Sequence, residues 1–179
     1  MDEVRKLRYL DSRDLTGFID GTENSKGDER AKAALIGDGD PEFAAGTCIF
    51  IQRYIHDLAK WSTLPVSDQE KIIGRRKLDN EELPPAVKPP TAHISRIAVE
   101  ENGSELKIVR YNCPFGTLSK AGLLFIAYTR DFGIPQKMLS RMVGTSGDGL
   151  HDRLLDYTKP VSGATFFAPS IDMLSSLTA

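Results

Sequence analysis

The first strong hydrophobic pattern along the chain is a run of β-branched and aromatic residues, TCIFIQRYI, at residues 47–55. Such a run is typical of a β-strand. A short helix is expected directly after it, over residues 56–61. A second helix is predicted over residues 67–74, because Ser67 and Glu70 have the spacing of a capping box and the segment ends on a glycine.

Residues 78–91, LDNEELPPAVKPPT, are acidic and hold four prolines, so this segment is predicted to be a long loop. The loop ends two residues before His93. Beyond it the pattern predicts an antiparallel run of three strands, with a hairpin turn at Asn102 and Gly103 between the first two. These strands are expected at residues 93–100, 106–113 and 122–131.

Helical spacing of apolar residues returns toward the C-terminus. Two helices are expected there, at residues 135–144 and 148–158, and the tail at residues 162–177 predicts a short strand and a last helical turn. The order of these elements, with antiparallel neighbours, indicates the α+β class. We therefore expect a single domain over residues 1–179, built on an antiparallel sheet with helices on one face.

Composition and charge disfavour several kinds of partner. The 179 residues carry a formal charge of −2, so the chain lacks a global positive field that would recruit nucleic acid or an anionic membrane. No apolar run approaches the length of a membrane span, and the N-terminus does not resemble a signal peptide. We expect a cytoplasmic protein. The two cysteines, Cys48 and Cys113, lie in apolar stretches far apart and are expected to be reduced and packed in the core.

Several catalytic signatures are missing from the sequence. It has no GxSxG, GxxxxGK[ST] or GxGxxG motif and no HExxH spacing, which disfavours acyl transfer, nucleotide hydrolysis, dinucleotide binding and zinc hydrolysis. The histidines are His56, His93 and His151, and each of them could be structural. His93 opens a predicted strand directly after the proline-rich loop, and His151 stands beside Asp152 in a predicted helix.

Three polar residues stand out by their surroundings. The segment GFIDGTEN places Asp20 between two glycines, at positions 17 and 21. It is either a surface turn or a loop that presses a carboxylate against a bound group, because glycine permits close backbone approach. Arg110 lies in a mostly apolar strand, where it could form a structural ion pair or serve a site. The same two interpretations apply to Asn112.

The combination of these segments resembles the dye-decolourising peroxidases, in particular their short bacterial type. A histidine in TAHISR lies 73 positions after Asp20, and an arginine in IVRYNCPFGT lies 17 positions further on. The resemblance runs from about Leu10 to the C-terminus and includes QEKIIGRRK, LLDYTKPVSG and FFAPS. This chain has TENS where the family usually has TENP. Membership implies haem peroxidase activity and a ferredoxin-like fold, as half of a dimeric α+β barrel-type enzyme.

The resemblance also implies a role for each site residue. His93 would be the axial ligand of haem iron, with haem b as the cofactor. Asp20 and Arg110 would lie on the opposite face, where they would act on peroxide, and Asn112 would place peroxide or a water. Because a free aspartate has a pKa near about 3.9, a carboxylate base stays ionised in acid, and we expect an acidic pH optimum.

Further residues are expected around the cofactor. A carboxylate that accepts the other N–H of His93 would raise the electron density of the ligand, and Asp152 is the first candidate for it, with Asp156 the second. The remaining cofactor contacts are expected from Gly21, Thr22, Glu23 and Arg110.

Members of the family are usually about twice this length, so the chain resembles their C-terminal half alone. Without the first half one apolar sheet face would lose its cover, and such a surface promotes association. We expect a homo-oligomer, a separate chain that supplies the missing half, or a fragment. The expected small-molecule partners are hydrogen peroxide and a reductant such as a dye or a phenol. Two other functions stay open, a non-catalytic haem or porphyrin carrier and a cofactor-free interaction module.

Overall fold

The computed structural model describes residues 12–117 and 120–177. In chain order the elements are α1 (Gly27–Ala34), β1 (Thr47–His56), α2 (Leu58–Ser62), α3 (Val66–Ile73), α4 (His93–Ile97), β2 (Glu100–Glu101), β3 (Ser104–Glu105), β4 (Val109–Gly116), β5 (Ala121–Thr129), α5 (Gly133–Met142), the 3₁₀-helix η1 (Arg153–Asp156), β6 (Thr158–Ala168) and α6 (Ile171–Leu177). Within these residues, no helix is long and apolar enough to cross a membrane.

Four strands form an antiparallel sheet in the order β4, β5, β1, β6. The central strand β1 pairs with β5 on one side, where Gln52 lies opposite Phe125, and with β6 on the other. The register with β6 shifts between Arg53 and Tyr54, so β6 carries an extra residue there. The sheet is thus built from segments that lie far apart in the sequence.

The strand predictions are largely confirmed. Strands β1 and β5 lie where residues 47–55 and 122–131 predicted them. Strand β4 lies slightly later than residues 106–113, and β6 is longer than the short strand expected in the tail. The turn at Asn102 and Gly103 is also confirmed, since it joins β2 to β3 with φ of 52° and 73° at its two central residues.

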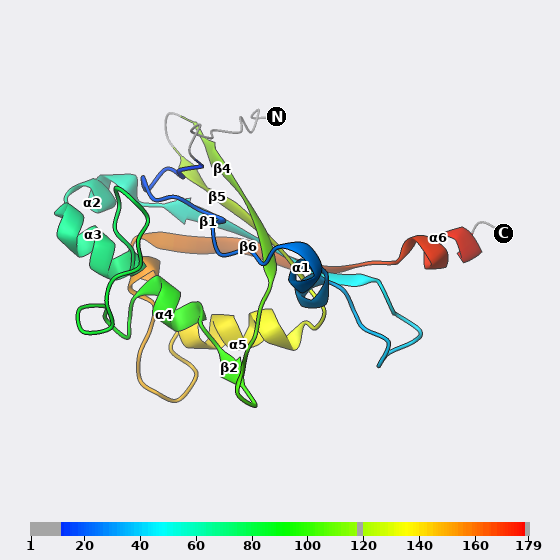
Figure 1. The fold of residues 1–179 in the computed structure, drawn as a ribbon. Coiled ribbons are helices and arrows are strands. Elements are labelled where there is room, and N and C mark those ends of the chain that lie inside the picture. The colour runs from blue at the N-terminus through cyan, green and yellow to red at the C-terminus, as the bar shows by residue number, and fades with distance from the viewer. Residues whose placement is uncertain (1–11, 118–119, 178–179) are drawn as a thin grey trace.

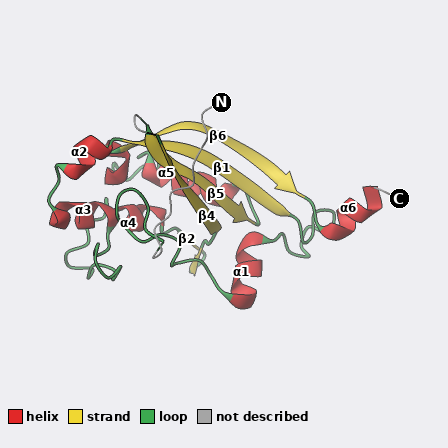
Figure 2. Cartoon of the chain, turned by 90° about the horizontal axis from the view of Figure 1, so that it is seen from above, coloured by secondary structure: helices red, strands yellow, loops and turns green. Residues whose placement is uncertain are grey.

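Helices α4 and α5 lie on one side of the sheet, and α2 and α3 lie at one end of its strands (Figures 1 and 2). Helix α3 confirms the helix predicted over residues 67–74, but the predicted capping box is wrong, because the N-cap is Pro65 without a side-chain hydrogen bond and Ser67 lies inside the helix. Helix α5 begins two residues before the predicted start at Pro135. Helix α2 lies slightly later than residues 56–61. Helix α1 was not predicted. The α+β class and the arrangement of helices on one face are both confirmed.

His93 begins a helix, so the strand predicted over residues 93–100 is wrong except at Glu100, the first residue of β2. Tertiary packing decides the conformation here. A Cβ atom on Gly74 would lie 2.5 Å from Cγ1 of Ile94, so the start of α4 fits closely over the end of α3. Arg96, in the next part of the helix, is only 1 % exposed. Neither contact can be predicted from the local pattern of hydrophobic residues.

The helix predicted over residues 148–158 is also wrong, because most of it is loop. Gly149 has a φ of +71°, a left-handed conformation that an α-helix does not contain. The carboxylate of Asp152 accepts a hydrogen bond from the backbone N–H of Leu154 and caps the short η1. His151 therefore lies in the loop and not on a helix.

Two apolar clusters pack the helices against the loops beside them. One contains Phe18, Trp61, Ile72, Ile73 and Tyr157, and the other contains Val99, Leu106, Ile134 and Met138. Both cysteines are unpaired. Cys48 is buried as expected, whereas Cys113 is only half-buried.

The opposite face of the sheet is apolar and accessible. One row crosses all four strands through Tyr111, Ile126, Ile51 and Ala164. Tyr111 and, one row away, Phe166 are each about half exposed, at 47 % and 53 %. Exposed apolar surfaces of this kind mark interaction sites.

Candidate active site

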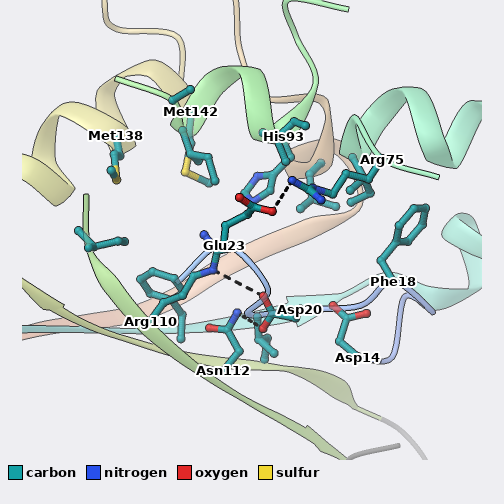
Figure 3. Close-up of a pocket in the computed structure, with 18 of the residues that line it drawn as sticks. Asp14, Phe18, Asp20, Glu23, Arg75, His93, Arg110, Asn112, Met138 and Met142 are labelled. Atoms are coloured by element: carbon teal, nitrogen blue, oxygen red, sulfur yellow. Dashed lines mark hydrogen bonds and ion pairs between the residues drawn. The ribbon is translucent and has the colours of Figure 1, made fainter. Parts of the chain in front are cut away.

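A cavity of about 460 Å³ lies between the helix-covered face of the sheet and helices α4 and α5 (Figure 3). This volume falls within the range of roughly 300–1,000 Å³ that is usual for small-molecule sites. Much of the wall is apolar and includes Phe50, Phe125, Met138 and Met142. Polar side chains come from the N-terminal loop (residues 12–26), from β4 and from the start of α4.

Asp20, Arg110 and Asn112 form one polar cluster on the sheet side of the cavity. Nε of Arg110 lies 3.6 Å from Oδ1 of Asp20, and Nδ2 of Asn112 donates a hydrogen bond to Oδ2 of the same carboxylate. Arg110 and Asn112 are two residues apart on β4, so they project from the same face of the sheet. The structure thus brings together the three residues that the sequence predicted as catalytic.

The loop that carries Asp20 depends on its two glycines. Gly17 and Gly21 have φ of +86° and +80°, in the left-handed region that favours glycine. The N–H of Gly21 donates to Oδ1 of Asp20 at 2.7 Å, which fixes the carboxylate relative to its own backbone. A Cβ atom on Gly21 would meet nothing within 4 Å, so conformation and not crowding by protein atoms requires glycine here.

Asn24 connects this loop to β4 and was not singled out by the sequence. Its Nδ2 donates to the carbonyl oxygen of Arg110 at 2.8 Å, and its Oδ1 accepts from the N–H of Arg110 at 2.9 Å. The side-chain amide thereby takes the place of a neighbouring strand. Because asparagine is common in polar turns, its type alone could not reveal this contact.

His93 lies across the cavity from this cluster, at the first residue of α4 (Figure 3). Its Nδ1 lies 2.6 Å from Oδ2 of Asp152, whose side chain is fully buried. The other oxygen of Asp152 accepts from the N–H of Leu154 at 2.9 Å. With Nδ1 engaged by a carboxylate, the imidazole keeps Nε2 for another partner.

The second candidate carboxylate, Asp156, lies elsewhere. Its oxygens pair with Nε2 of His151 at 3.0 Å and with Nε of Arg153 at 2.9 Å. Of the two carboxylates that the sequence left open, Asp152 is therefore the one that contacts His93.

Of the residues predicted beside the cofactor, Thr22, Glu23 and Arg110 line the cavity, whereas Gly21 does not. Glu23 forms an ion pair with Arg75 at 2.7 Å, and Oγ1 of Thr22 accepts from Asn80 at 3.0 Å. Thr22, Glu23 and Arg75 all line the cavity. Arg75 was not predicted from the sequence, because its partner is 52 positions away.

Burial shifts the pKa of three titratable groups in the wall. It lowers the pKa of His56 to about 4, raises that of Tyr54, and raises that of the Asp14 carboxyl. Nδ1 of His56 lies 2.7 Å from Oγ1 of Thr158, and its Nε2 is buried without a hydrogen-bond partner. All three shifts favour the neutral form of the group.

Comparison with known proteins gives a consistent result. Residues 11–173 match the family model of the Dyp-type peroxidase, C-terminal. The chain is 45 % identical over 177 residues to a dye-decolorizing peroxidase of Mycolicibacterium paratuberculosis and 44 % identical to one of Mycobacterium tuberculosis. These alignments cover 97 % of this chain but 50 % and 53 % of the relatives. The chain thus spans about half the length of these relatives.

Solved structures agree with this result. A variant of Rhodococcus jostii RHA1 DypB in complex with heme is 42 % identical, with a TM-score of 0.90, over 96 % of this chain and 56 % of that protein. A Dyp-type peroxidase from Shewanella oneidensis is 48 % identical, with a TM-score of 0.91, over 97 % of this chain and 57 % of that protein. The chain therefore belongs to the Dyp-type peroxidases and corresponds to their C-terminal part.

Proposed function

We propose that this chain forms the haem-binding and peroxide-activating site of a dye-decolourising peroxidase. The observation that carries the proposal is a single cavity with His93, which Asp152 holds from behind, on one wall and the Asp20, Arg110 and Asn112 cluster on the facing wall (Figure 3). The heme complex of the related DypB supports the choice of cofactor. We infer haem b, with hydrogen peroxide as the oxidising substrate.

The residues present fit this cofactor. Nε2 of His93 would bind the iron, since a metal-binding histidine commonly donates its other N–H to a carboxylate, as His93 can to Asp152. The apolar walls suit a porphyrin, and Thr22 and Glu23 line the same cavity as Asp20 and Arg110. Oδ1 of Asn112 is buried without a hydrogen-bond partner, so an acceptor is free on the sheet side. When bound, haem would supply the redox-active iron that reduces peroxide.

Asp20 is proposed to move the proton that the reaction requires. One oxygen of peroxide must lose a proton and the other must gain one before it leaves as water. Oδ2 of Asp20 would take the proton from the first oxygen and return it to the second. The hydrogen bonds from Gly21 and Asn112 hold the carboxylate in one orientation for both transfers.

Arg110 and Asn112 are proposed to assist this transfer. The permanent charge of Arg110, 3.6 Å from Asp20, favours the ionised carboxylate and would stabilise negative charge that develops as the O–O bond breaks. Oδ1 of Asn112 would accept a hydrogen bond from bound peroxide or water, which would orient the substrate between the two walls.

The electrons are proposed to come from a small-molecule reductant such as a dye or a phenol. Because the chain spans about half of its relatives, the full activity is proposed for this chain together with whatever covers its accessible sheet face. That cover would be the remaining half of a longer protein or a second copy of the chain.

An absorption spectrum of the chain reconstituted with haem tests the proposal. We expect a Soret band that is lost in His93→Ala, kept in His151→Ala, and altered by one equivalent of hydrogen peroxide. His151 is a suitable control because it lies outside the cavity. Haem that binds without any response to peroxide would favour a carrier instead. Haem binding that is independent of His93 would contradict the proposed ligand.

A further inference from the structure

We infer that Arg96 is a positioning residue for the His93–Asp152 pair, because it fixes the loop between α5 and η1 that delivers Asp152. This inference deepens the proposed function and rests on it for its relevance to haem. Arg96 does not line the cavity, so it would act only through the pair.

The guanidinium of Arg96 binds the loop at several points. It forms a two-pronged ion pair with Asp148, with NH1 at 2.6 Å from Oδ2 and NH2 at 3.1 Å from Oδ1. NH2 also donates to the carbonyl of Leu150 at 3.1 Å and to Oγ of Ser146 at 3.2 Å. Nε and NH2 both donate to the carbonyl of Arg141, at 3.0 and 2.8 Å. The arginine thus joins the end of α5 to three residues of the loop.

The loop has internal hydrogen bonds, from Oγ of Ser146 and the N–H of Leu150 to Asp148, but it is rich in glycine. Gly144, Gly147 and Gly149 have φ of +79°, +88° and +71°, and glycine loses more conformational freedom on ordering than any other residue. Every residue from Val143 to Leu150 is exposed or half-buried. A loop of this kind needs an external anchor, and Arg96 is a buried cation with several acceptors around it.

Asp152 follows directly on this anchored segment. Its N–H donates to the carbonyl of Met142 at 2.8 Å, and the N–H of Arg153 donates to the carbonyl of Thr91 at 3.1 Å. Leu150, which Arg96 holds, is two residues earlier. The N–H of Asp152 thus ties the end of the loop to the end of α5, and Arg96 holds the residues before it.

His93 and Arg96 are three residues apart on α4, and such residues lie on neighbouring positions of one helix face. The same short helix thus presents the histidine and fixes the loop that brings its carboxylate partner. If Arg96 were lost, the partly buried carbonyls of Arg141 and Leu150 and the carboxylate of Asp148 would lose the hydrogen bonds that Arg96 donates, and the loop would open more often.

The test is NMR on the full chain without haem. The chain has three histidines, so the ring signals of His93 can be assigned by comparison with His93→Gln. We expect a downfield Nδ1–H proton, protected by its bond to buried Asp152. In Arg96→Met this proton should exchange at least about tenfold faster than in the wild type, because the local opening that exposes it becomes easier.

Matched variants separate positioning from general stability. Arg13→Met removes a guanidinium that also binds backbone carbonyls, those of Gly17, Lys77 and Leu78, at a different loop. It should leave the His93 signal unchanged. Arg96→Lys should restore part of the protection, and Asp148→Asn, which keeps the carbonyl contacts of Arg96, should have a smaller effect than Arg96→Met.

Unchanged protection of the His93 proton in a folded Arg96→Met chain would overturn the inference. If that variant does not fold, the same comparison in Arg96→Lys and Asp148→Asn decides, and unchanged protection in both would overturn it. The haem titration of the wild type is independent of these results. If Arg96→Met loses protection but the wild type binds no haem, the inference stands and the proposed function is rejected. If the wild type binds haem but Arg96→Met keeps its protection, the proposed function stands and the inference is rejected.

Discussion

The side-chain amide of Asn24 forms two hydrogen bonds with the backbone of Arg110, one to its carbonyl and one from its N–H. A residue of the N-terminal loop thereby extends the pairing of β4 beyond the sheet. Asp20, four residues earlier, is brought against Arg110 and Asn112 by this contact. The catalytic cluster that we propose is therefore held together by the hydrogen bonds of Asn24 to the backbone of β4 as well as by charge.

Replacement of Asn24 by alanine should lower the free energy of unfolding by roughly 1–3 kcal/mol, because two partly buried backbone groups lose their partners. Asn24→Asp keeps an acceptor for the N–H of Arg110 but has no donor for its carbonyl, so its effect should be intermediate. Urea denaturation measures both, with exposed Gln136→Ala as the control. Equal stability of Asn24→Ala and the control would contradict the assigned role.

Asp20→Asn should lower kcat/KM for hydrogen peroxide by about 10²–10⁴-fold if Asp20 transfers the proton, since this is the usual contribution of a positioned base. The amide has nearly the same shape, so haem binding should change little. Stopped-flow mixing of the reconstituted chain with peroxide measures the rate. A rate close to that of the wild type would show that Asp20 is not the base.

Asp152→Asn should weaken haem binding by about 10–100-fold, as is typical when the carboxylate partner of a metal-binding histidine is lost. Asp156→Asn should have little effect, because that carboxylate pairs with His151 and Arg153. Transfer of haem to an excess of apomyoglobin gives the dissociation rates of both variants. A similar rate in the two would contradict the assignment of Asp152.

His56 should make the protein less stable in acid. Burial lowers its pKa to about 4 in the folded chain, below the ordinary value of 6.5. As the pH falls through that interval the unfolded state binds a proton that the folded state refuses, so stability falls. Between about pH 7 and about pH 4.5 the loss from this group is roughly 2–3 kcal/mol.

The contribution of His56 can be isolated with His56→Gln, which does not titrate. The wild type and the variant contain the same other titrating groups, so the difference between their denaturation curves at the two pH values reports on His56. The wild type should lose more stability than the variant over this interval. Equal losses would show that His56 is protonated as easily in the folded chain as in the unfolded one.

Gly21→Ala should destabilise the chain by about 1–2 kcal/mol, because a left-handed φ of +80° is unfavourable for residues with a Cβ atom. Gly39→Ala is a matched control, since neither glycine has an atom within 4 Å of the added methyl group and only Gly21 has a positive φ. The difference between the thermal unfolding of the two variants therefore measures the cost of a side chain at a positive φ. A loss as large in Gly39→Ala would remove the role assigned to the backbone of Gly21.

Local patterns predicted the parts of the fold that local chemistry determines. The β-branched run of β1, the glycine that ends α3 and the turn at Asn102 all act within a few residues. The start of α4 at His93 could not be predicted in this way. Its conformation depends on Gly74 and on the buried contacts of Arg96, both of which are tertiary.

The same division applies to the site. Asp20, Arg110 and Asn112 were predicted from a resemblance, and the structure places them together. Asn24 was missed because its partner is 86 positions away. Asp152 was already preferred to Asp156 from the sequence, but the contact of its carboxylate with Nδ1 of His93 depends on the loop after α5 and is visible only in the structure.

Helix α4 restricts which changes the chain can accept between His93 and Arg96. An α-helix turns about 100° per residue, so one inserted or deleted residue would rotate Arg96 away from Asp148 while His93 stayed in place. Substitutions of the two intervening residues leave that angle unchanged. Among descendants of this sequence, length should therefore be far less variable than composition in this stretch.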